Sequence, residues 1–350
     1  MFIHVIRGVV AGLAATALIG TTFAILAREW VAVLFGACAL GMFLGIARLV
    51  WSTSNQPRVD PGKSELGPFH TLSGKRLLAL LGGGFVVGGA LMVTVDALLS
   101  PPLIAYGRAA LGYGLYGFIA LGLWDAARRH RVEFARVKGA FPDRNKVWKS
   151  LTMVIPLLLF SYGTVWVVYY PLSILSPELV EIVLLQSNVF ARSAEGALEI
   201  GPNVVSAFAL IVVAPIVEEV FFRGFLLHRW ALTWGVRSSV AGTTVVFASL
   251  HADPLGALLF GFVMAVIYLK TRSLGLVIAC HILNNLIAYA TGVVHALIEE
   301  TNITYTVMDF QAEWWMAALA LILSLPWAVR FVRNSWPDNG WDLPYQTVRE

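Results

Sequence analysis

The feature that most constrains this chain is its series of apolar runs, several of which reach the roughly 20 residues needed to cross about 30 Å of hydrocarbon. Only 13% of the 350 residues are Asp, Glu, Lys or Arg, whereas 58% are hydrophobic. That balance excludes a soluble globular enzyme, a disordered chain and a coiled coil. The sequence predicts an all-α fold, a polytopic transmembrane helical bundle of about ten spans in the plasma membrane. Hydropathy places the spans over 8–27, 30–50, 77–99, 103–126, 151–175, 203–228, 239–252, 255–270, 275–297 and 314–333.

Loop charge predicts the orientation of the bundle, because an excess of Lys and Arg marks the cytoplasmic side of a membrane protein. The loop 127–150 is rich in Arg and Lys, whereas the next loop, 176–202, carries mainly Glu. Alternating the spans outward from these loops puts both the N- and the C-terminus in the cytoplasm. The net charge of +4 is explained by such loops, so membrane lipid is an expected partner and nucleic acid is not.

The pattern of spans and loops suggests three parts. Residues 1–150 form an N-terminal transmembrane region of about four spans that ends in the basic cytoplasmic loop. Residues 151–335 form a second helical region, and 336–350 form a cytoplasmic tail that we expect to be interfacial or disordered.

Ionisable residues inside the spans indicate function, because each costs at least about 2.5–3.5 kcal/mol at the bilayer centre without a partner. Asp96 and Arg108 lie in neighbouring spans, and we predict a structural ion pair between them. The sixth span carries Glu218, Glu219 and Arg223. Glu219 and Arg223 are four residues apart and predict a pair on one helix face. Glu218 points about 100° away from that face, so its partners must come from other helices.

Two further spans supply polar groups that could complement Glu218. His251 ends the seventh span, and the ninth carries His281 and Asn285, which share a helix face. In one possible chemistry, Glu218 and His251 activate a water while His281 and Asn285 donate to an oxyanion. In the other, the histidines and a carboxylate bind zinc, which activates the water.

These residues resemble the three motifs of the CAAX-protease and bacteriocin-processing family of intramembrane proteases, the CPBP or ABI family. The motifs are Glu218-Glu219-x-x-x-Arg223, Phe247-x-x-x-His251 and His281-x-x-x-Asn285. The resemblance covers roughly 203–297 and implies that 151–335 is a helical protease core, open to lipid and to the cytoplasmic side. It implies Glu218 as the base, His251 as its partner on the water, His281 and Asn285 as the oxyanion hole, and Glu219 and Arg223 as supporting residues.

The resemblance leaves the metal open. Family members were first classed as metalloproteases, and a metal-free glutamate mechanism is now the favoured account. On that mechanism no cofactor is required. If zinc is bound, we expect the ligands to be His251, His281 and Glu218.

Two functions of different class follow. The first is an intramembrane endopeptidase that resembles a CAAX prenyl protease and hydrolyses a peptide bond near the cytoplasmic face. Its substrate would be a peptide or membrane protein, with or without a prenyl group. The alternative is a non-enzymatic transporter or scaffold that retains a buried polar cluster.

Overall fold

A computed structural model describes residues 67–99, 101–185, 190–193, 196–299, 305–338 and 341–345. Within these ranges the chain is helical, apart from turns and a single isolated β-bridge between Arg192 and Leu198. The predicted all-α fold is therefore confirmed. The predicted spans 8–27 and 30–50 lie outside the described residues.

Six of the described helices follow predicted spans closely, and three segments have π-helical geometry. The α-helices are α4 (Pro68–Thr71), α5 (Gly74–Leu98), α6 (Pro101–Arg129), α7 (Phe134–Lys138), α8 (Arg144–Thr152), α9 (Val154–Leu175), α10 (Pro177–Val180), α11 (Ile200–Phe208), α12 (Ala214–Glu219), α13 (Leu227–Ala248), α14 (Pro254–Thr271), α15 (Leu274–Glu299), α16 (Val307–Ala312) and α17 (Trp314–Ser335). The π-helical segments are η2 (Glu181–Leu185), η3 (Ala209–Val213) and η4 (Val220–Leu226).

Six helical stretches in the described part of the chain are long and apolar enough to cross a membrane. This confirms an integral, multi-pass membrane protein. The total of about ten spans, the cytoplasmic termini and the plasma membrane stay predictions. The six stretches are Gly74–Leu98, Arg144–Leu175, Ile200–Ala248, Pro254–Thr271, Leu274–Ile298 and Trp314–Ser335.

The stretch Ile200–Ala248 has 49 residues, which as one straight helix would measure about 74 Å, more than twice the hydrocarbon thickness. Its backbone leaves helical geometry at Gly235, where φ is 79° and ψ is 162°. A residue with a Cβ is strained in that conformation, so glycine suits the position. Ser239 Oγ donates to the carbonyl of Leu227 at 2.7 Å, which ties the two sides of the turn together. Gly235 thus separates the predicted spans 203–228 and 239–252.

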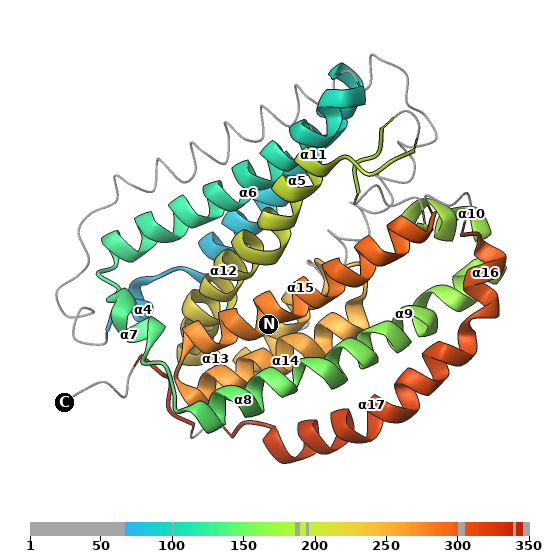
Figure 1. Cartoon of the computed structure of the whole chain (residues 1–350). Helices are drawn as coiled ribbons and strands as arrows, with labels where there is room; N and C mark the ends of the chain where they lie inside the picture. Colours follow the sequence, from blue (N-terminus) through green and yellow to red (C-terminus); the bar gives the residue numbers. More distant parts are fainter. Residues whose placement is uncertain are drawn as a thin grey trace.

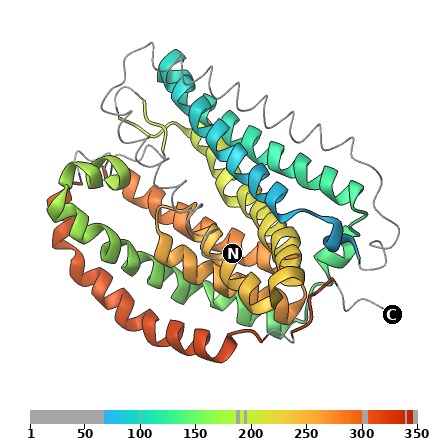
Figure 2. The ribbon, with the colours of Figure 1, turned by 180° about the vertical axis from the view of Figure 1, so that it is seen from behind.

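The long helices form two groups that meet at one end and diverge at the other (Figure 1), and the view from behind shows the same arrangement (Figure 2). One group contains α5, α6, α11 and α12, and the other contains α9, α14, α15 and α17. Contacts of α15 with α12 and with η3 join them. Helix α14 is the most enclosed, since Val263, Met264 and Tyr268 are fully buried. Glu218 and Glu219 therefore lie where the two groups meet.

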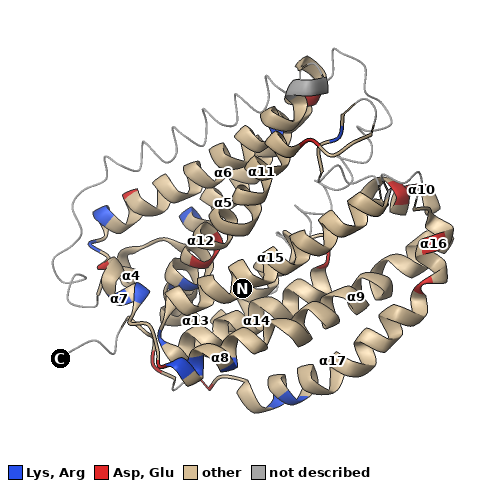
Figure 3. Ribbon diagram, in the orientation of Figure 1, with Lys and Arg blue, Asp and Glu red and all other residues tan. Residues whose placement is uncertain are grey.

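Charged residues are unevenly distributed along the bundle (Figure 3). Lys and Arg gather at the end that contains α7 and α8, and acidic residues mark α10 and α16 at the opposite end. The predicted pair of Asp96 and Arg108 is confirmed, with Arg108 Nε 2.7 Å from Asp96 Oδ1 between α5 and α6.

The described part of the C-terminal tail packs against the bundle, which differs from the predicted interfacial or disordered end. Leu343 and Tyr345 are buried, and the Tyr345 ring makes an edge contact with Phe69 at 5.1 Å between ring centroids. The backbone N–H of Glu133 donates to the Tyr345 hydroxyl at 3.2 Å. Apolar and aromatic contacts hold this segment, which loop charge and hydropathy do not reveal.

Candidate active site

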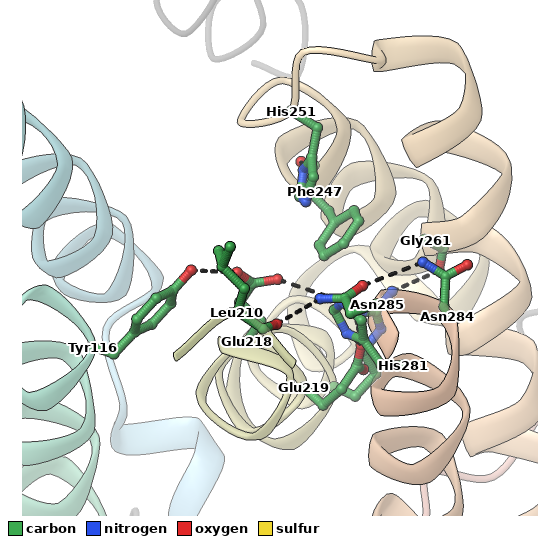
Figure 4. A network of polar contacts seen from close by, with 11 residues as sticks. Tyr116, Leu210, Glu218, Glu219, Phe247, His251, Gly261, His281, Asn284 and Asn285 are labelled. Carbon is green, nitrogen blue, oxygen red and sulfur yellow. Dashed lines mark hydrogen bonds and ion pairs between the residues drawn. The ribbon is translucent and has the colours of Figure 1, made fainter. Parts of the chain in front are cut away.

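Glu219 anchors a buried polar cluster (Figure 4). Its side chain is 0% exposed, and its Oε1 lies 2.9 Å from Arg223 Nη1. This confirms the ion pair predicted from the i,i+4 spacing. Arg223 also donates from Nη2 to the carbonyl of Gly261 on α14 at 2.9 Å. A charge buried in this way is tolerable only when it is paired and hydrogen-bonded. Arg223 meets that condition, whereas Glu219 Oε2 is buried without a hydrogen-bond partner among the described residues.

His281 links the two glutamates from α15. Its Nδ1 lies 2.8 Å from Glu219 Oε1, and its Nε2 lies 3.9 Å from Glu218 Oε2. An ionised carboxylate only accepts hydrogen bonds, so beside ionised Glu219 the Nδ1 atom carries a proton. Nε2 is then an acceptor in the neutral ring and a donor in the imidazolium. His281 can therefore stabilise an oxyanion from Nε2 only in its doubly protonated form.

Glu218 has its own partner, which the sequence did not indicate. Its side chain is 18% exposed, and the hydroxyl of Tyr116 on α6 donates to Oε1 at 3.0 Å. Tyr116 lies in a predicted span rich in glycine and tyrosine, but spacing alone does not say which helix its hydroxyl reaches. The site therefore includes a residue from the region 1–150.

Asn285 is held against the helix that carries Glu218, and Pro215 explains how. In η3 the N–H of Ala214 bonds to the carbonyl of Ala209, five residues earlier. The same register would pair the carbonyl of Leu210 with residue 215, which is a proline and has no N–H. That carbonyl instead accepts from Asn285 Nδ2 at 2.9 Å. A second Nδ2 hydrogen of Asn285 is left for a ligand.

Asn284 and Asn285 are adjacent on α15, and their contacts show which of the two amides belongs to the site. Asn284 Nδ2 donates to Asn285 Oδ1 at 3.2 Å. Asn285 Oδ1 thus accepts a hydrogen bond within α15, and Asn285 Nδ2 faces the helix that carries Glu218. Asn285 is the amide that reaches across to that helix, as its i,i+4 spacing from His281 predicted.

His251 lies apart from the acidic pair, at the end of the helix that begins after Gly235. Its Nδ1 lies 2.8 Å from the carbonyl of Phe247, and its ring is 4.3 Å from the Phe247 ring between centroids. Figure 4 shows Phe247 between His251 and His281. In the described part of the chain, His251 and Glu218 are not in direct contact. The structure thus brings Glu218 beside His281 rather than beside His251.

Helix α9 fixes the turn that carries His251. Ser161 Oγ donates to Asp253 Oδ2 at 2.5 Å, and Thr164 Oγ1 donates to Asp253 Oδ1 at 3.1 Å. Asp253 also caps α14 by accepting from the N–H of Gly256 at 3.0 Å. The hydroxyl of Tyr169 donates to the carbonyl of Ala252 at 2.8 Å. The short gap between the predicted spans 239–252 and 255–270 is thus a hydrogen-bonded turn.

The arrangement does not assemble the three predicted zinc ligands. His281 Nδ1 is engaged by Glu219, and His251 faces its own helix. Among the described residues, no group of three or more His, Cys, Asp or Glu side chains lies close enough to hold a metal ion. The described residues therefore do not form the predicted zinc site.

Comparison with known proteins gives one match. Residues 200–287 match the family described as type II CAAX prenyl endopeptidase Rce1-like. This confirms the resemblance predicted from the motifs. The matched range contains Glu218, Glu219, Arg223, His251, His281 and Asn285, and it excludes Tyr116. No curated protein and no solved structure matched the chain.

Proposed function

Because residues 200–287 match a CAAX endopeptidase family, we propose that this protein is an intramembrane endopeptidase that hydrolyses a peptide bond near the cytoplasmic face. The observation that carries the proposal is the juxtaposition of Glu218 Oε2 and His281 Nε2, 3.9 Å apart at the junction of the two helix groups. That distance is too long for a direct hydrogen bond and leaves a water room to sit beside both atoms.

The proposed reaction uses Glu218 as the base. Glu218 takes a proton from the water while the water oxygen attacks the carbonyl carbon of the peptide bond. The same proton then passes to the leaving nitrogen as the C–N bond breaks. Asn285 Nδ2 and the Nε2–H of the His281 imidazolium donate to the oxyanion of the tetrahedral intermediate.

The charges of the cluster support an imidazolium at His281. With His281 charged, the side chains of Arg223 and His281 balance those of Glu218 and Glu219. A balanced cluster is less costly to bury than one with a net charge. In this proposal Glu219 and Arg223 support the reaction by holding His281 in place.

His251 keeps its proposed role as the second group on the water. Catalytic hydrogen bonds are often loose in a free enzyme and tighten when substrate binds. The substrate of the proposed reaction is a peptide or membrane protein in the lipid phase, with or without a prenyl group. The rate of a His251→Ala variant tests this assignment.

The first experiment is a cleavage assay on the full-length protein purified in detergent. Fluorogenic prenylated peptides and matched unprenylated peptides are compared, with and without a zinc chelator. We expect Glu218→Gln to lower the rate roughly 10²–10⁴-fold, because general base catalysis contributes about that much. Glu133→Gln is the matched control, since Glu133 pairs with Arg136 on the surface.

An unchanged rate in Glu218→Gln would overturn the mechanism. Loss of activity in the presence of the zinc chelator would indicate that the reaction uses zinc. Proton-dependent uptake by a protein that cleaves no peptide would favour the transporter instead.

A further inference from the structure

Tyr116 on α6 touches the proposed base directly, although it lies outside the matched range 200–287. We propose that Tyr116 is a positioning residue for Glu218, so that the α5–α6 hairpin completes the catalytic site. This inference rests on the proposed function, because Glu218 is the base only in that reaction. Of the two measurements that test it, one does not require proteolysis.

The packing of α6 fixes where Tyr116 points. Helix α6 contacts α11, η3 and α12, the continuous stretch that carries Glu218. Tyr113, three residues before Tyr116, donates its hydroxyl to the carbonyl of Val205 on α11 at 2.9 Å. Tyr113 and Tyr116 thus lie on one face of α6 and reach the same stretch of helix. Only Tyr116 reaches a carboxylate there.

The contact divides the two oxygens of Glu218 between two tasks. Oε1 accepts from the Tyr116 hydroxyl at 3.0 Å, which restricts rotation of the carboxylate. Oε2 is then the oxygen that faces His281 Nε2 at 3.9 Å. Without the hydroxyl, the carboxylate can rotate about its terminal bond, and this bond has a broad, roughly two-fold torsion. The reacting geometry would then be occupied for a smaller fraction of the time.

Partners that orient a reacting group typically contribute about 10–100-fold, a range measured for the outer partners of metal ligands. We expect Tyr116→Phe to lower kcat by about that factor with KM nearly unchanged, because the hydroxyl contacts the base rather than the substrate. Tyr113→Phe is the matched control: it removes a hydroxyl from the same face of the same helix. A role for Tyr116 in helix packing alone would affect both variants equally.

The second readout is the reaction of Glu218 with a hydrophobic carbodiimide, followed by mass spectrometry of the labelled peptide. We expect several-fold more labelling of Glu218 in Tyr116→Phe than in the wild type or in Tyr113→Phe, since Oε1 is no longer occupied. Tyr116→Met is a second variant that removes the hydroxyl and retains apolar volume, and it must reproduce the increase.

The outcomes separate the two proposals. If the wild type cleaves no peptide, the proposed function fails, and labelling still decides whether Tyr116 holds Glu218. Equal loss of kcat in Tyr116→Phe and Tyr113→Phe overturns the positioning role. Labelling of Glu218 that does not change when Tyr116 is replaced overturns it as well.

Discussion

Glu219 Oε1 is a shared acceptor: Arg223 Nη1 donates to it from the same helical stretch and His281 Nδ1 from α15. Arg223 adds a bond to the carbonyl of Gly261 on α14. Three helical segments are therefore joined through one fully buried pair. The stability of the bundle and the orientation of His281 depend on the same side chains.

Replacing Arg223 by Met should destabilise the protein strongly. Breaking a buried pair by removing one partner costs about 3–5 kcal/mol, because the other charge is left uncompensated. The measurement is the free energy of unfolding in detergent. Arg108→Met is the control, since the Arg108–Asp96 pair is about one-third exposed and should contribute below about 1 kcal/mol. An equal loss of unfolding free energy in the two variants would show that breaking the buried pair costs no more than breaking the exposed one.

Some of these contacts could be predicted from the sequence. The pair of Glu219 and Arg223 follows from a spacing of four within one helix. The contacts of Glu218 with Tyr116 and of Arg223 with Gly261 join residues far apart in the chain, and their register depends on how whole helices pack. Periodicity indicates which residues share a face, but not which helix that face meets.

At the level of elements, the π-helical segments η3 and η4 flank the six residues of α12. Such segments are rare and are frequently found at functional sites. The sequence predicted the outer bounds well, as for 255–270 against Pro254–Thr271, because hydropathy changes sharply there. It did not predict the π register, which depends on Pro215 together with the contact between Leu210 and Asn285.

Replacing Pro215 by Ala should separate stability from activity. The new N–H can bond to the carbonyl of Leu210, which then no longer holds Asn285 in place. A proline inside a helix usually costs stability, so we expect the variant to be at least as stable as the wild type. We expect the cleavage rate to fall roughly 10-fold or more, because displacing the Asn285 donor by about 1 Å lowers the rate steeply.

The control for this prediction is Pro326→Ala in α17, another helix with an internal proline. That change is expected to leave the cleavage rate unaltered, since Pro326 lies outside the proposed site. Thermal unfolding and peptide cleavage are measured on both variants. A Pro215→Ala protein with the wild-type rate would show that the π register does not control Asn285.

At the scale of the whole molecule, the segment 341–345 packs against α4, α13 and the start of α7, which are far apart in the chain. Tyr345 contacts Phe69 of α4, lies 6.3 Å from the His228 ring of α13 between centroids, and accepts from Glu133 beside α7. The sequence predicted a tail but not its docking, because its apolar side chains are few and scattered. Hydropathy detects long runs, whereas docking of this kind depends on single side chains.

Replacing Tyr345 by Ala should lower the free energy of unfolding by about 2 kcal/mol, the usual gain from burying a large side chain. Tyr345→Phe keeps the ring contacts and loses only the acceptor for the Glu133 N–H, so about 1 kcal/mol is expected. Chemical denaturation of both variants distinguishes these values. Equal costs for the two variants would mean that the ring contributes nothing.

The docked tail also sets an order of events during biosynthesis. Tyr345 leaves the ribosome after every helix that it contacts, so the aromatic surface around Phe69 and His228 stays uncovered while the earlier spans insert. A chain cut short before Leu343 could place all of its predicted spans in the membrane and still expose that surface. Cellular quality control that detects uncovered apolar surface would therefore distinguish a chain that contains Leu343 and Tyr345 from one cut short before them.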